Sequence, residues 1–144
     1  MIALSSPLLV GIYRDNELIK SYVKNEQTSD ALPLVFDDII QNYQINSIYF
    51  ANGPGSFMAI KVTYIFLKTL SITLGIEMFA SDGFLFNDNC PIRALKRVYF
   101  VKKDGKILTK TTKEEYKQTF SLPNFLEKES FSKNCDPLYI LPAV

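Results

Sequence analysis

The stretch Ser47-Ile48-Tyr49-Phe50-Ala51-Asn52-Gly53-Pro54-Gly55-Ser56-Phe57 decides the fold of this 144-residue chain. Its opening apolar run has the length of a buried strand, and Gly53-Pro54-Gly55 breaks the backbone before a long apolar segment. Serine is a preferred helix N-cap, so we expect a helix from Ser56 to Leu74 that ends at Gly75. A second strand is expected at 76–80. The order strand, helix, strand favours parallel pairing of the two strands.

The residues before this unit predict a β-meander. Short apolar runs at 2–4 and 8–13 have strand length, and turn-forming residues follow at 14–17. Apolar and polar residues then partly alternate at 18–23, as in a strand with one buried face.

The segment from residue 29 to residue 43 predicts an amphipathic helix. Thr28, Ser29 and Asp30 can each cap its start. Apolar residues recur with the 3, 4, 7 spacing of one buried helix face. This face comprises Leu32, Val35, Phe36, Ile39, Ile40 and Tyr43.

The helix expected from Ser56 to Leu74 has more apolar surface than one sheet face can cover. Lys61 and Lys68 lie almost above one another on a helical wheel, and apolar side chains occupy most of the remaining circumference. These are Met58, Ile60, Val62, Ile65, Phe66, Leu67 and Leu70. A lysine at the bilayer centre costs about 2.5 to 3.5 kcal/mol, which argues against a membrane span. A neighbouring helix or a partner chain must therefore cover the rest.

The composition changes after Ser81-Asp82-Gly83. Asp104-Gly105 is a strong hairpin signal, and it lies between expected strands at 95–101 and 106–111. Residues 138–141 are expected to form a closing strand.

Charge and residue types limit the function. The formal net charge is +1, which does not favour a free-standing nucleic-acid binder. Without histidine, the chain has no imidazole base, no Ser-His-Asp triad and no histidine metal site. Cys90 and Cys135 are too few for a disulfide framework, and the first residues do not resemble a secretory signal. We expect a cytoplasmic protein with two reduced thiols, no catalytic residues and no metal site.

Two features have a chemical and a structural interpretation. The Gly53-Pro54-Gly55-Ser56 turn aims backbone N–H groups and a helix N-terminus at one point, which suits an anion. A tight packing turn is the alternative, because the spacing and lysine of a P-loop are missing. Lys102-Lys103 and Lys106 beside Tyr99-Phe100 suit RNA phosphate. Protection of a sheet edge is the alternative there.

The segment Phe50-Ala51-Asn52-Gly53-Pro54-Gly55-Ser56-Phe57, its long helix and Leu74-Gly75-Ile76 resemble the hallmark of the TsaB (YeaZ) family. Agreement extends from residue 1 to about 82, and Pro137 to Leu141 resembles the family's closing strand. The resemblance implies an α/β, actin-like and Hsp70-like ATPase (ASKHA) fold with a mixed sheet and helices. The first lobe would span 1–82, and a truncated second lobe would span 83–144.

The resemblance also implies a function. The chain would be a short, divergent, non-catalytic scaffold subunit of the complex that makes threonylcarbamoyladenosine on tRNA. It would dock the catalytic subunit TsaD, with TsaE joining, and would contact tRNA only through the complex. It would need no cofactor, with ATP and magnesium on the partners, and would form a homodimer when alone.

Family pairing uses the two helices of the first lobe, which suits the apolar helix from Ser56 to Leu74. The interface residues expected from it are Leu32, Val35, Phe36, Ile39, Phe57, Ile60, Thr63, Phe66, Leu67 and Leu70, and the motif loop comprises Gly53, Pro54, Gly55 and Ser56.

The chain departs from the family at several points. Leu4-Ser5-Ser6 stands where the family has Ile-Asp-Thr-Ser, so the carboxylate that related ATPases place near a metal-bound nucleotide is missing. Met58-Ala59 replaces the common Thr-Gly, and the chain is shorter than usual members. A small nucleotide-binding or phosphotransfer protein that uses the Gly53 to Ser56 turn stays open as an alternative. A protease would need a metal or nucleophile constellation that the sequence does not contain.

Overall fold

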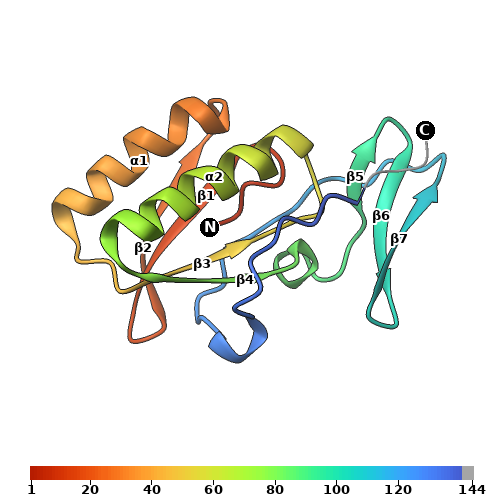
Figure 1. The fold of residues 1–144 in the computed structure, drawn as a ribbon. Helices are drawn as coiled ribbons and strands as arrows, with labels where there is room; N and C mark the ends of the chain where they lie inside the picture. The colour runs from red at the N-terminus through yellow and green to blue at the C-terminus, as the bar shows by residue number, and fades with distance from the viewer. Residues whose placement is uncertain (141–144) are drawn as a thin grey trace.

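The computed structural model describes residues 1–140 and has the α/β character that the sequence predicts. Two long helices lie on one side of the first four strands, and a small three-stranded sheet stands beyond one end of them (Figure 1). The strands pair in three groups rather than in one continuous ladder.

The first four strands form two pairs. Strands β1 (Leu8–Arg14) and β2 (Glu17–Lys24) are antiparallel and are joined by a tight turn in which Asp15 and Asn16 have positive φ. Strands β3 (Ser47–Ala51) and β4 (Glu77–Ser81) are parallel, in register from Ser47–Glu77 to Ala51–Ser81. The predicted meander turn and the parallel unit are confirmed.

Residues 1–4 connect the two strand pairs. Ile2 and Leu9 exchange two backbone hydrogen bonds of 2.8 and 3.0 Å. On the other side, Ala51 N donates to Met1 O at 3.0 Å, and the Met1 amino group donates to Tyr49 O at 2.7 Å. The strand expected at 2–4 is thus reduced to one isolated bridge, yet it links β1 to β3.

The helices begin and end close to the predicted residues, but their caps differ. Helix α1 (Thr28–Asn42) has Gln27 at its N-cap, so the three proposed capping residues lie inside the helix. Helix α2 (Phe57–Leu74) has Ser56 at its N-cap as predicted, but the Ser56 side chain makes no capping hydrogen bond. Gly75 ends α2 at φ 66°, the left-handed conformation that glycine adopts without strain.

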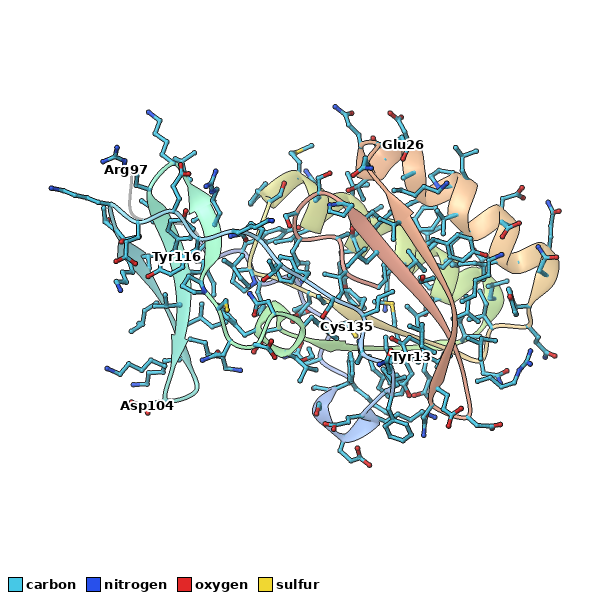
Figure 2. All side chains as sticks on the ribbon, turned by 180° about the vertical axis from the view of Figure 1, so that it is seen from behind. Tyr13, Glu26, Arg97, Asp104, Tyr116 and Cys135 are labelled. Atoms are coloured by element: carbon cyan, nitrogen blue, oxygen red, sulfur yellow. The ribbon has the colours of Figure 1, made fainter. Side chains whose placement is uncertain are left out.

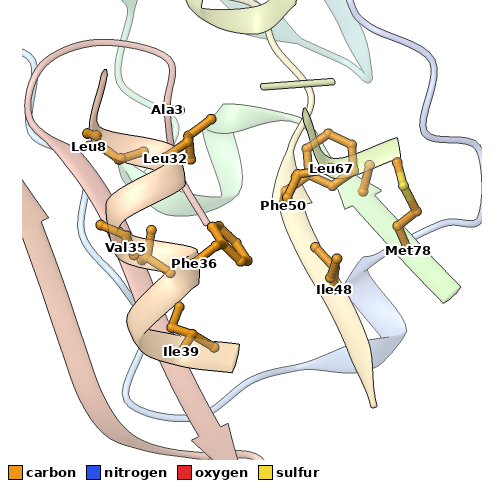
Figure 3. Close-up of a cluster of buried hydrophobic side chains, with 13 residues drawn as sticks. Ala3, Leu8, Leu32, Val35, Phe36, Ile39, Ile48, Phe50, Leu67 and Met78 are labelled. Carbon is orange, nitrogen blue, oxygen red and sulfur yellow. The ribbon is translucent and has the colours of Figure 1, made fainter. Parts of the chain in front are cut away.

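The main core lies between the two helices and strands β1, β3 and β4. Side chains from one face of α1 meet Leu67 of α2 and the inner residues of β3 (Figure 3). The rings of Phe36 and Phe66 join the helices directly, with their centroids 5.3 Å apart. Leu32 and Leu67 are fully buried. The predicted apolar face of α1 is confirmed at Leu32, Val35, Phe36 and Ile39, which are buried. The prediction is wrong for Ile40, which is 44% exposed, and Tyr43 is partly buried against the core.

The second half begins with the short 3-10 helix η1 (Gly83–Phe86), which leads to a three-stranded antiparallel sheet. This sheet has the order β5 (Ile92–Leu95), β6 (Val98–Lys103) and β7 (Lys106–Thr111). The Asp104-Gly105 hairpin is confirmed, and both residues have positive φ. The strand expected at 95–101 is wrong in its start, because Lys96 turns the chain between β5 and β6 with φ 48°.

Residues 112–140 return across the body of the protein with one short 3-10 helix, η2 (Lys128–Ser130). Ala80 and Ser132 exchange two backbone hydrogen bonds of 2.8 Å, and Leu138 N donates to Asn52 O at 2.8 Å. Residues 138–140 form no strand, and Leu141 lies outside the described residues. The expected closing strand is therefore wrong for 138–140.

The returning segment shares a core with the first half. Phe120, Leu122 and Phe131 pack against a buried cluster drawn mainly from the first 60 residues, which comprises Ile2, Leu4, Leu9, Ala51, Ile60 and Phe86. The division into lobes at 1–82 and 83–144 stays a prediction.

The two faces of α2 should differ sharply in their contribution to stability. Leu67→Ala removes a fully buried side chain and should lower the free energy of unfolding by about 2 to 5 kcal/mol. Ile72→Ala on the same helix removes a side chain that is 71% exposed and, at protein concentrations where the chain is monomeric, should change it by less than about 0.5 kcal/mol. Urea denaturation of both variants measures the difference. Equal losses of unfolding free energy in the two variants would contradict the packing of α2.

Candidate partner-binding face and motif loop

The motif loop is held by protein groups on both sides. Gly53 O accepts a hydrogen bond from Gly83 N at 2.9 Å, and Ser56 N donates to Leu4 O at 3.0 Å. A Cβ added to Gly55 would lie 2.7 Å from the same Leu4 oxygen. The glycine at 55 therefore permits the end of the first segment to approach the helix start.

The C-terminal segment covers the other side of the loop. A Cβ on Gly53 would lie 2.8 Å from Leu138 O, and Gly53 also has φ 131°. Asn52 donates through Nδ2 to Asp136 O at 2.9 Å. The ring of Tyr139 lies 4.6 Å from that of Phe57, centroid to centroid. These contacts fit the packing interpretation of the Gly53 to Ser56 turn, because Gly53 and Pro54 are buried against residues of the same chain, whereas Ser56 is exposed.

Leu4 is the first residue of Leu4-Ser5-Ser6, the segment that departs from the pattern of the resembled family. Its side chain is buried and lies against Gly55 and Gly83. An apolar side chain thus fills the junction of the first segment, the motif loop and the start of η1.

Most of the predicted interface residues lie inside the protein. Those on α1 and the inner side of α2 are buried in this chain's own core, so they cannot form a partner surface while the chain keeps this packing. They are Leu32, Val35, Phe36, Ile39, Ile60, Thr63 and Leu67. Phe66 and Leu70 are half-buried against that core. Phe57 is exposed over 44% of its surface and contacts Tyr139.

A different face of α2 is free. Met58, Ile65 and Ile72 are exposed over 64%, 57% and 71% of their surfaces. They are seven residues apart, so they lie in one row on the side opposite Ile60, Thr63 and Leu67. We call Met58, Ile65 and Ile72 the α2 stripe. Sequence reasoning missed it because apolar residues occur on both sides of the helix, although the seven-residue spacing was visible.

Helix α2 is long and apolar enough to cross a membrane by length and composition alone. Its inner side, however, packs on the sheet and α1, and two exposed lysines, Lys61 and Lys68, flank the α2 stripe. The absence of a membrane role stays a prediction.

Within residues 1–140, no group of three or more Cys, Asp or Glu side chains is placed to hold a metal ion. The Cys135 thiol donates to Met78 O at 3.3 Å, and burial raises its pKa, so the protonated form is favoured. Burial likewise raises the pKa of Tyr13 to about 12, and its hydroxyl donates to Pro123 O at 2.6 Å.

A cavity of about 820 Å³ lies between β1, β3 and the end of α1. Its lining includes Gly11, Tyr13, Tyr43, Tyr49 and Leu122. The motif loop, Gly53 to Ser56, does not line this cavity. Of the predicted interface residues, Phe36 and Ile39 line it.

No protein-family model matches the chain, and no curated protein matches its sequence. Its structure is nevertheless similar to solved ones. One is described as YeaZ from Pseudomonas aeruginosa, with a TM-score of 0.61 and 12% sequence identity over 77% of this chain and 62% of that one. Another, described as an uncharacterized protein with similarity to peptidase YeaZ from Pseudomonas aeruginosa, gives a TM-score of 0.59 and 13% identity over the same shares.

The chain spans less than two thirds of the length of these structures. At such low identity the similarity concerns the fold, and it agrees with the family that the residues around Gly53 to Phe57 resemble. The protein has a YeaZ-like α/β fold.

Proposed function

We propose that this protein is a non-catalytic scaffold subunit of the tRNA threonylcarbamoyladenosine complex, which docks the catalytic subunit TsaD through the exposed side of α2. The α2 stripe on a YeaZ-like fold is the observation that carries the proposal. TsaE joins the complex, and a TsaB-type subunit of this kind works in the cytoplasm.

The α2 stripe has the character of an interface centre. Three large apolar side chains in a row are unusual on a free surface, where exposed apolar residues are normally scattered. Lys61 and Lys68 beside them provide a polar rim, which matches the apolar centre and charged edge of specific interfaces. Specific interfaces bury about 800 Å² on each partner, so neighbouring elements must contribute as well.

Without TsaD, the same face pairs with a second copy. A two-fold dimer places one patch against itself, and a row with a seven-residue repeat along a helix is self-complementary in this arrangement. The homodimer and the complex with TsaD therefore compete for one surface.

Catalysis belongs to the partner in this proposal. The hydrogen-bonded motif loop, which is buried at Gly53 and Pro54, leads into α2 and fixes the direction of the α2 stripe, while ATP and magnesium bind to the other subunits. The chain itself requires no cofactor, and the reaction's tRNA is positioned by the assembled complex.

Charged residues placed in the α2 stripe should abolish both the homodimer and the complex with TsaD. We expect the double variant Ile65→Asp, Ile72→Asp to sediment as a monomer at concentrations where the wild-type chain is a dimer, because burying two carboxylates in an apolar contact is costly. The same variant should no longer co-purify with tagged TsaD from the same source. Analytical ultracentrifugation and affinity co-purification measure the two effects.

Leu95→Asp is the matched control, because Leu95 is 61% exposed on the separate small sheet. It should dimerise and bind TsaD like the wild type. Retention of TsaD by the double variant would refute the docking proposal. Phe66→Asp is unsuitable here, because Phe66 contacts Phe36 inside the core.

The nucleotide alternative makes the opposite prediction for the motif loop. We expect calorimetric titration with ATP and magnesium to show no magnesium-dependent binding, and Gly55→Ala to act on stability instead. The added methyl would meet Leu4 O at 2.7 Å, which should lower the free energy of unfolding by about 1 to 3 kcal/mol. Ser56→Ala, which removes no capping bond, should be nearly neutral. Tight ATP binding that Gly55→Ala abolishes would support the alternative.

A further inference from the structure

The overall charge of +1 conceals a strong separation of charge. Residues 92–117, which contain the small sheet and the segment after it, carry nine Lys or Arg and three Asp or Glu, a net charge of +6. The rest of the chain carries seven basic and twelve acidic residues, a net charge of −5. The small sheet lies at one end of the molecule (Figure 1).

Strand register places part of this charge on one face. Lys103 is paired with Lys106, and Tyr99 is paired with Lys110 and with Arg93. Paired residues share a face, and residues two apart along a strand return to it. Arg93, Lys103, Lys106 and Lys110 therefore lie on the same face, which we call the outer face. The opposite face carries Ile92, Phe100 and Ile107, which pack toward Phe84 and the body of the protein.

The basic side chains of the outer face, unlike that of Lys102, make no ion pair with a carboxylate among the described residues. Lys102 lies on the inner face, where its Nζ is 2.5 Å from Asp82 Oδ2. All four basic residues of the outer face are exposed.

The segment after β7 adds to the same surface. Tyr116 packs on Tyr99 with ring centroids 5.2 Å apart, and its backbone N donates to the Tyr99 hydroxyl at 3.2 Å. This contact brings the exposed residues Lys113 and Lys117 beside the sheet, together with the exposed Glu114 and Glu115, so the segment extends the charged surface without adding net charge. Figure 2 shows Tyr116 between Arg97 and Asp104, which mark the two ends of the sheet.

Protection of a sheet edge explains only part of this pattern. Lysines on an edge strand such as β7 discourage pairing with another chain. Lys103 is on the central strand β6, and Lys113 and Lys117 lie outside the sheet, so they protect no edge. An extended basic surface is the electrostatic footprint of a polyanion.

We propose that the outer face of the β5–β7 sheet binds the phosphate backbone of RNA directly. The choice of RNA over an acidic protein rests on the proposed function in tRNA modification, and it goes beyond contact with tRNA through other subunits. Lysine and arginine on a sheet recognise phosphates without reading sequence, so binding is weak, sequence-independent and sensitive to salt.

The test uses the full chain and a fluorescein-labelled, mixed-sequence single-stranded RNA of 20 nucleotides. Anisotropy titrations between about 25 and 200 mM salt give the affinity and its salt dependence. The triple variant Lys103→Gln, Lys106→Gln, Lys110→Gln should bind at least about tenfold more weakly at low salt. Its slope of log K against log salt should be smaller by about 2, since each lost phosphate contact contributes about 0.7.

Lys20→Gln, Lys24→Gln, Lys133→Gln is the matched control, because it removes the same charge from the body of the protein. It should retain most of the binding. Equal losses in both triple variants, or no anisotropy change with the wild type, would overturn the proposal. Salt-sensitive self-association that the outer-face variant abolishes, without RNA binding, would instead assign the face to the acidic body of a second copy.

The docking and RNA proposals can fail separately. The Ile65→Asp, Ile72→Asp variant leaves the outer face intact and should bind the RNA like the wild type. Loss of TsaD binding with RNA binding unchanged shows that the two surfaces are independent.

Discussion

The close approach of Leu4 to Gly55 and Gly83 is the contact on which the rest of the structure depends. It joins the end of the first segment to the start of α2 and to the chain leaving β4. A Cβ at residue 55 would lie 2.7 Å from Leu4 O, so either Leu4 or the start of α2 would have to shift. The far end of the α2 stripe, at Ile72, lies 15 residues beyond the start of α2, which is about 22 Å at about 1.5 Å of rise per residue.

The same contact places an apolar side chain, Leu4, at the junction of the first segment and the motif loop. Leu138 and Tyr139 lie on the other side of the loop. The backbone geometry of the motif loop is therefore needed for packing.

The sequence predicted the local structure well, but it did not separate the buried from the exposed apolar residues of α2. Strand β3, Gly75 and the Asp104-Gly105 turn follow from local rules, and all three were correct. The capping residues of α1 were wrong because several adjacent residues satisfy the same preference, and tertiary packing decided among them. The first segment, 2–4, was predicted as a strand, but it forms only the bridge from Ile2 to Leu9. The contacts of the preceding Met1 with Tyr49 and Ala51 lie too far along the chain for local rules to specify.

The interface residues illustrate a more general difficulty. An apolar side chain satisfies the hydrophobic effect equally well in a core or in a complex, so composition did not separate Leu67 from Ile65. Only the position of the sheet distinguishes the two sides of α2. Likewise, the balance of formal charge hid the basic sheet, because a sum over residues contains no information about where they lie.

This separation of charge gives the molecule a large electric dipole. A polyanion attracts the small sheet and repels the body, so it turns the protein before any contact forms. The approach is directed to the end of the molecule that carries the small sheet, while α2 lies over the other strands (Figure 1). Orientation during encounter is therefore a property of the whole chain, and it weakens as salt screens the field over about 10 Å at 0.1 M.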